Sequence, residues 1–149
     1  MNRLALPSSL RSSATTRGQL IPARSLRISP SSTRAFATLP VASNTAVEDY
    51  KKKVDEYLSK KKLVVSYFTA TWCGPCQRIA EDVEALSEKL ESKVAIAKID
   101  IDQNGALAEE HRIMAVPTFV LSAAGAGEVD RVQGASVANL EAKLKEQLD

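Results

Sequence analysis

The stretch LVVSYFTATWCGPC, residues 63–76, joins a run of β-branched and aromatic residues to both cysteines of the chain, Cys73 and Cys76. The apolar run at 63–70 is too continuous for a half-exposed strand and predicts a strand buried on both faces. The cysteines follow where the chain turns into a helix. Such a pair can be a structural disulfide, half of a metal site or a reversible redox pair, and the other residues have to distinguish these.

The N-terminal segment differs in composition from the rest of the chain. Residues 1–36 contain six arginines, eight serines and no acidic residue, which is typical of an organelle-targeting presequence. No segment of the chain approaches the ~20 apolar residues of a membrane span. The motif RAF-AT, residues 34–38, resembles a mitochondrial processing site, so we expect cleavage after Phe36. The expected location is the mitochondrial matrix, with the chloroplast stroma as the alternative; a disordered basic arm is the other interpretation.

Removal of the presequence changes the charge of the protein. Of the 20 basic residues six lie in the presequence, so 14 remain against 18 acidic residues, a net charge of −4. A mildly acidic protein is a poor binder of polyanions, and we expect neither a nucleic-acid nor a membrane partner. The remaining residues suffice for one domain with a hydrophobic core, which argues against a structural disulfide.

The pattern of apolar residues predicts a single α/β domain at 45–149, preceded by a flexible lead-in at 37–44. Thr45 and Glu48 match a capping box that opens a first helix. The later segments predict, in order, the strand at 63–70, one long helix through 79–90, a strand at 94–101, a short helix at 106–112, strands at 118–122 and 128–134, and a last helix capped by Ser136. Strands joined through helices should be parallel and the final hairpin antiparallel, which gives a mixed central sheet with helices on both faces.

The position of the cysteines favours redox chemistry. Three positions apart at a helix start, Cys73 and Cys76 lie on one face with Cβ atoms ~5–6 Å apart, close to the ~3.5–4.5 Å of a disulfide. The free N–H groups of the helix start favour a thiolate at Cys73. Pro75 suits the first helical turn, and Gly74 leaves the backbone open to another chain.

A metal site is poorly supported by the residues available. Structural zinc needs four ligands, and besides the two cysteines the chain offers only His111, whose charged neighbours predict a solvent-facing side chain. A cluster shared between two chains stays open as an alternative. A cysteine pair in a βαβ context predicts a dithiol–disulfide function.

Several motifs in the expected order resemble the thioredoxin family across residues 45–149. WCGPC is identical to the active-site motif of the family, and the stretch that contains it is similar to the mitochondrial o-type thioredoxins of plants and algae. The matching segments are YFTATWCGPC at 67–76, AKIDIDQN at 97–104, AVPTF at 115–119 with the family's cis-proline, and QGA at 133–135.

The resemblance implies a thioredoxin-like fold and a protein-disulfide reductase without a cofactor of its own. Cys73 would be the attacking and Cys76 the resolving cysteine of a redox-active disulfide. Pro117 would lie against the sulfurs, and the backbone of Val116 would pair with the target peptide. The implied docking surface consists of Trp72, Gly74, Pro75, Val116, Pro117, Gly134 and Ala135.

The resemblance also implies partners. These are an NADPH-dependent thioredoxin reductase, which carries its own flavin, and disulfide-containing targets such as peroxiredoxins, with the chain itself a monomer. The rival hypothesis is a non-catalytic binding module of the same fold, or a dimer bridged by an iron–sulfur cluster.

Two positions depart from the family pattern. Most members have a buried aspartate where this chain has Tyr67, so a carboxylate role at Cys76 cannot be transferred to that position. Lys98, which often pairs with that aspartate, is expected to point to solvent, and both residues are candidate modulators of the site. Glu81 replaces a helix-kinking proline, which predicts a straighter long helix.

Overall fold

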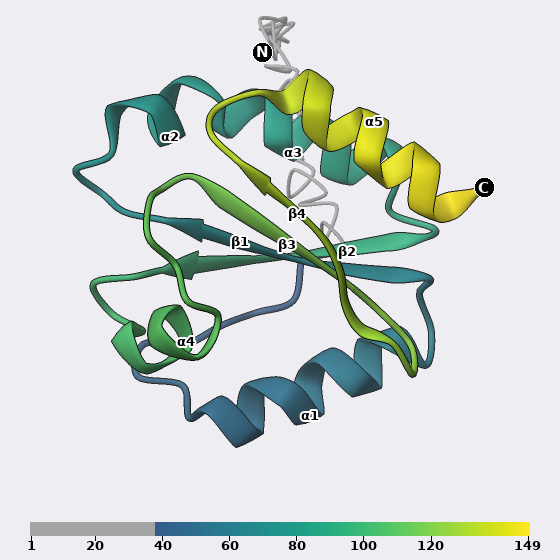
Figure 1. Cartoon of the computed structure of the whole chain (residues 1–149), viewed down its shortest axis with the longest axis horizontal. Coiled ribbons are helices and arrows are strands. Elements are labelled where there is room, and N and C mark those ends of the chain that lie inside the picture. Colours follow the sequence, from purple (N-terminus) through teal and green to yellow (C-terminus); the bar gives the residue numbers. More distant parts are fainter. Residues whose placement is uncertain (1–37) are drawn as a thin grey trace, which may run out of the picture. The chain divides into compact units, whose positions relative to one another are not determined.

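A buried central strand, β1 (Leu63–Thr69), organises the domain. The structure, a computed structural model, describes residues 38–149, so the presequence and its cleavage after Phe36 lie outside the described residues. Every residue of β1 is buried, as predicted. It pairs in parallel with β2 (Val94–Asp100) and antiparallel with β3 (Thr118–Ala123), whose other side pairs antiparallel with β4 (Gly127–Gln133) (Figure 1).

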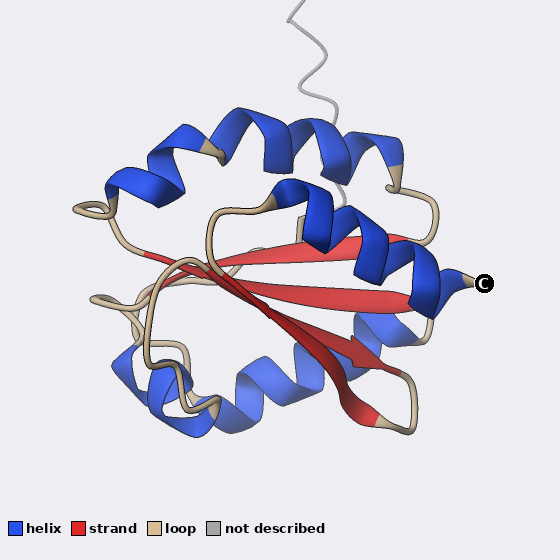
Figure 2. Cartoon of the chain, turned by 45° about the horizontal axis from the view of Figure 1, so that its top comes forward, coloured by secondary structure: helices blue, strands red, loops and turns tan. Residues whose placement is uncertain are grey.

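Helices cover both faces of this four-stranded sheet (Figure 2), which confirms the predicted α/β architecture. One face carries α1 (Val47–Leu58) and α4 (Gly105–Glu110), and the other carries α2 (Gly74–Arg78), α3 (Ala80–Lys89) and α5 (Val137–Leu148). Ser136 caps α5 as predicted, because its Oγ accepts the Asn139 N–H at 3.3 Å. None of the helices within residues 38–149 combines the length and apolar character that a bilayer crossing requires.

The alternation of side chains along β1 divides the core into two layers. Val65 and Tyr67 pack with side chains of α3 and α5. Phe68 points to the opposite face and packs with Tyr50 of α1 and Leu107 of α4. The face of the sheet that lies under α2 and α3 is therefore the face that carries Tyr67.

The direction of β3 differs from the prediction. Strands joined through a helix were expected to be parallel, but β3 runs antiparallel to β1 and hence to β2. The connecting helix α4 has only 6 residues and is about 9 Å long. It cannot carry the chain back along a strand of about 23 Å, so β3 starts at the edge where β2 ends.

The helix predicted through residues 79–90 is interrupted at its start. Ile79 adopts φ −99° and ψ 0°, which separates α2 from α3, although Glu81 stands where the family has a kinking proline. The prediction of a straighter helix is therefore wrong. The break lets Cys76 pack at the strand edge while Ile79 and Val83 pack into the sheet core.

The capping box at Thr45 and Glu48 is not formed. The N-cap of α1 is Ala46, and no side chain caps this helix. The Thr45 Oγ1 instead donates to the Ala42 carbonyl at 2.7 Å, and the Thr45 N–H donates to the Asn104 side chain at 3.0 Å. The side chain that the local pattern assigned to the cap thus bonds to a carbonyl three residues earlier, and the backbone of Thr45 bonds to a residue distant in sequence.

The segment predicted as a flexible lead-in is attached to the domain over its described part, residues 38–44. Thr38 bridges in parallel to Ile96 of β2, and the Leu39 N–H donates to the Ile96 carbonyl at 3.1 Å. The Leu39 side chain is only 1% exposed and belongs to the core layer under α1 and α4. Ala37 lies outside the described residues.

His111 was predicted to face solvent, but its ring is half-buried. It lies at the end of α4 with its ring centroid 5.3 Å from that of Phe68 and 6.2 Å from that of Tyr50. Burial lowers the pKa of His111 below its ordinary value of 6.5. Glu128 and Glu110 oppose this shift, whereas Arg131 and Lys51 reinforce it.

Substitution of Leu39 tests whether the lead-in belongs to the core. We expect Leu39→Ala to lower the free energy of unfolding by about 2–5 kcal/mol, the usual cost of truncating a buried leucine. Ser43→Ala, an exposed change in the same segment, should cost within ~0.5 kcal/mol. Denaturant titration of both variants makes the comparison, and equal small losses would show that the lead-in adds nothing to the core.

The burial of His111 predicts a loss of stability on acidification. The folded state disfavours the protonated ring, so its contribution is full above the unfolded pKa near 6.5 and falls as the pH drops through that value toward the lower folded pKa. Between about pH 7.5 and 5.5 the melting temperature of the wild type should fall more steeply than that of His111→Gln. Parallel curves for the two proteins would rule out His111 as the titrating group.

Candidate functional site

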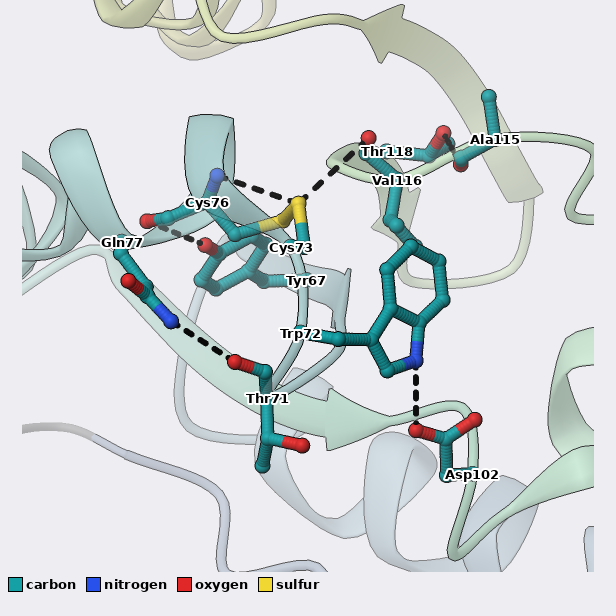
Figure 3. The surroundings of a disulfide bond; sticks show 10 residues. All are labelled: Tyr67, Thr71, Trp72, Cys73, Cys76, Gln77, Asp102, Ala115, Val116 and Thr118. Atoms are coloured by element: carbon teal, nitrogen blue, oxygen red, sulfur yellow. Dashed lines mark hydrogen bonds between the residues drawn. A yellow bond between two sulfur atoms is a disulfide. The ribbon is translucent and has the colours of Figure 1, made fainter.

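The two cysteines form a disulfide at the carboxyl end of β1 (Figure 3). Cys73 is the N-cap of α2, and its Cα lies 5.3 Å from that of Cys76. The Cys76 N–H donates to the Cys73 Sγ at 3.2 Å. This bond places a backbone donor of the helix start on the sulfur of Cys73, which favours a thiolate there once the disulfide is reduced.

Both cysteines of the disulfide are buried. Cys73 is 4% and Cys76 2% exposed, and both pack with Ala70. Gly74 and Pro75 between them are exposed. A Cβ at Gly74 would meet only the end of the Arg78 side chain, at 4.0 Å, so the approach to the disulfide over this turn is open.

The loop before β3 brings the predicted proline to the disulfide. The Val116–Pro117 peptide bond is cis, as the resemblance implied. The Val116 carbonyl oxygen lies 3.8 Å from the Cys73 Sγ. The Thr118 hydroxyl holds this loop by donating to the Ala115 carbonyl at 2.7 Å.

A third segment of the predicted docking surface joins this loop. The Gly134 N–H donates to the Pro117 carbonyl at 2.9 Å. Gly134 has φ +95°, a conformation that L side chains rarely adopt, so a glycine is required here. Gly134 and Ala135 are both exposed. The structure thus brings the turn between the cysteines, the cis-proline loop and the end of β4 to one edge of the sheet.

Trp72 is a surface residue and not part of the core. Its side chain is 66% exposed, and its indole N–H donates to the Asp102 carboxylate at 2.8 Å (Figure 3). Asp102 was not among the site residues predicted from the sequence. Asp102 follows β2, and the carboxyl ends of the parallel strands β1 and β2 meet at one edge, so their topology is the signal that could have found the pair.

Met114 is a second residue of this edge that the sequence did not predict. Within residues 38–149 the exposed large hydrophobic side chains are Trp72 and Met114, the latter 87% exposed. Met114 precedes Val116 by two residues in the loop that carries the cis-proline. An apolar side chain at this position adds to the apolar character of the predicted docking surface.

Tyr67 forms the base of the site. It is 3% exposed, its ring stacks on Phe119 with centroids 4.6 Å apart, and its hydroxyl points to the Cys76 carbonyl at 3.5 Å, a long and weak bond. Burial raises the pKa of the Tyr67 phenol above its ordinary value of 10.0, an effect that the Thr69 side chain partly offsets. The group therefore stays protonated at neutral pH and cannot act as a base there.

Lys98 and Tyr67 share one face of the sheet. The two residues are partners in the parallel register of β1 and β2, and the Lys98 side chain is exposed, as predicted. Both line a cavity of about 440 Å³ that Cys76 also lines. Among residues 38–149 no group of three or more His, Cys, Asp or Glu side chains is placed to hold a metal ion.

Comparison with known proteins agrees with this geometry. The sequence profile of the family named Thioredoxin matches residues 41–146. A thioredoxin of Geodia cydonium is 45% identical over 84 residues, 56% of this chain and 78% of the relative. Thioredoxin H5 of Arabidopsis thaliana is 39% identical over 98 residues, 66% of this chain and 81% of the relative.

A solved structure shares the arrangement of strands and helices. The X-ray structure of Fasciola hepatica thioredoxin aligns with a TM-score of 0.62 and 38% sequence identity, and the match covers 75% of this chain and 96% of that chain. The residues matched by the family profile include the disulfide and the cis-proline. On these findings, the chain belongs to the thioredoxin family.

Proposed function

We propose that this chain reduces disulfides of target proteins by dithiol exchange through Cys73 and Cys76. Thioredoxins act as protein-disulfide oxidoreductases. The observation that carries the proposal is the position of the Cys73 sulfur, which receives the Cys76 N–H and lies 3.8 Å from the carbonyl of Val116 in the cis-proline loop. A sulfur that accepts a backbone N–H and lies beside the backbone of the cis-proline loop suits attack on a disulfide in an extended peptide.

The exchange proceeds in two steps. The Cys73 thiolate attacks one sulfur of the target disulfide, and the other target sulfur leaves as a thiolate. A mixed disulfide then joins Cys73 to the target. Cys76 loses its proton and attacks the Cys73 sulfur, which releases the second target thiolate and closes the Cys73–Cys76 disulfide. The target gains two electrons and the chain loses them.

The docking surface positions the target for the first step. The backbone of Val116 pairs with the extended target segment, in the manner of an added strand. Trp72, Gly74 and Pro75 contact this segment on one side of the disulfide, and Gly134 with Ala135 contact it on the other. The exposure of these groups in the oxidised protein supports this role.

The remaining parts of the proposal concern partners and location. An NADPH-dependent thioredoxin reductase returns the disulfide to the dithiol, and targets such as peroxiredoxins consume it. The chain acts as a monomer in the mitochondrial matrix and belongs to the o-type subgroup. The arginine-rich, acid-free composition of residues 1–36 and the stretch at 67–76 support these assignments.

Cysteine variants test the exchange mechanism. Cys73→Ser should reduce the turnover of insulin disulfides, with thioredoxin reductase and NADPH, to the level of buffer, because no nucleophile remains for the first step. Cys76→Ser should keep the first step and accumulate a covalent mixed disulfide with the target on Cys73, visible by mass spectrometry.

Two outcomes would contradict the mechanism. Full insulin reduction by Cys73→Ser would exclude Cys73 as the nucleophile. An inactive wild type would favour the non-catalytic binding module, and visible absorbance of the freshly purified protein would then indicate the iron–sulfur-bridged dimer.

Deletion of the presequence tests the location. The full chain fused to a fluorescent protein should enter mitochondria, and a fusion lacking residues 1–36 should stay outside them. Mass spectrometry of the imported protein should identify Ala37 as its first residue. Import into chloroplasts would replace the matrix assignment with the stroma.

A further inference from the structure

The second step of the exchange needs a proton acceptor for Cys76. Cys76 is 2% exposed, so its proton cannot pass directly to bulk water. Tyr67 stands where most family members have an aspartate, and its neutral phenol donates to the Cys76 carbonyl. The candidate proton acceptors are therefore the other groups that line the same cavity as Cys76.

The register of the sheet identifies the groups beneath Cys76. Tyr67 pairs with Lys98 and Thr69 pairs with Asp100 across the parallel strands β1 and β2. Paired residues point to the same face, and so do residues two apart on one strand. These four side chains therefore lie on the face of the sheet that α2 covers. Cys76 lines the cavity of about 440 Å³ above them together with all four.

Only one of the titratable groups in this cavity is suited to accept a proton. The groups facing it from the described residues are Tyr67 of β1, Lys98 and Asp100 of β2, and Cys76 of α2. An ammonium group such as that of Lys98 donates hydrogen bonds but has no lone pair to accept one, and the phenol is neutral. Among these groups, the Asp100 carboxylate is the one that can accept a proton.

Asp100 is held in place and remains in contact with water. Its Oδ1 accepts the Asp102 N–H at 2.9 Å, which fixes the carboxylate at the turn after β2. The residue is partly exposed. A cavity of this volume has room for water molecules, and polar side chains in its lining, among them Thr69, Gln77 and Asn104, offer them partners. A proton can thus pass from Cys76 to the carboxylate through water.

We propose that Asp100 accepts the proton of Cys76 during the second step, a role that rests on the proposed function. The Cys76 thiol gives its proton to water in the cavity, and that water gives a proton to the Asp100 carboxylate. The Cys76 thiolate attacks the Cys73 sulfur, and the sulfur–sulfur bond to the target breaks. The released target thiolate takes up a proton from solvent, and Asp100 returns its proton to solvent, so protons and electrons balance.

The two steps can be measured separately with a chromogenic nitrobenzoate disulfide. The reduced protein releases one coloured thiolate when Cys73 attacks and a second when Cys76 resolves the mixed disulfide. In stopped-flow mixing, Asp100→Asn should leave the first phase within about twofold and slow the second by about 100-fold near neutral pH, the lower end of the range for loss of a general base. In the wild type the rate constant of the second phase should decrease as the pH is lowered, and in Asp100→Asn this decrease should be smaller.

Matched variants separate proton transfer from structure and from charge. Asparagine keeps an oxygen that can accept the Asp102 N–H, and Asp100→Glu should restore much of the second phase because it retains a carboxylate. Glu84→Gln removes one negative charge from an adjoining cavity, which Tyr67 and Lys98 also line. It should leave both phases unchanged. Thermal melting checks that each variant folds.

The outcomes distinguish this inference from the proposed function. Equal second phases in Asp100→Asn and the wild type, with the same pH profile, would overturn the role of Asp100 while insulin reduction still supports the exchange mechanism. Equal slowing by Glu84→Gln would reduce the effect to one of net charge and also overturn it. Failure of the wild type to reduce insulin would instead remove the proposed function.

Discussion

The burial of β1 on both faces is the constraint on which the site depends. Because β2 and β3 pair with its two edges and helices cover both faces, β1 can neither slip by one residue nor turn over without exposing its core side chains. Its carboxyl end is thereby fixed relative to the ends of its neighbours. The residues that leave this end have to turn at once, and Cys73 caps the helix that follows.

The parts of the fold that depend on local pattern were predictable from the sequence. The apolar run of β1, the turn with both cysteines and the cap at Ser136 are each encoded by adjacent residues. The errors concern residues whose partners are distant in the sequence. The backbone N–H of Thr45 bonds to the Asn104 side chain, and Leu39 packs on β2 because a neighbouring strand is there to receive it. Nothing in the local pattern specifies either partner.

In the functional site, too, the features encoded by adjacent residues were predictable and those that depend on distant partners were not. The motif predicts the cysteine pair, and the resemblance predicts the cis bond before Pro117. The bond from Trp72 to Asp102 depends on the two parallel strands ending at the same edge, a fact of the assembled sheet. The exposure of Met114 likewise follows from the path of the loop and not from its composition, since an isolated methionine in an apolar segment is more often buried.

A buried carboxylate at position 67 would have to fill the base of the site and also accept a proton. With Tyr67 in this place, two different residues perform these two tasks. A carboxylate beneath α2 would need a partner to remain charged, since isolated buried charge is costly. Tyr67 instead stacks on Phe119 and fills the same space with an aromatic ring, which stabilises the base of the site. The group that accepts the proton can then lie at the partly exposed end of β2, where Asp100 remains in contact with water. The redox site thereby has an apolar base, and its proton chemistry takes place at the margin of the sheet.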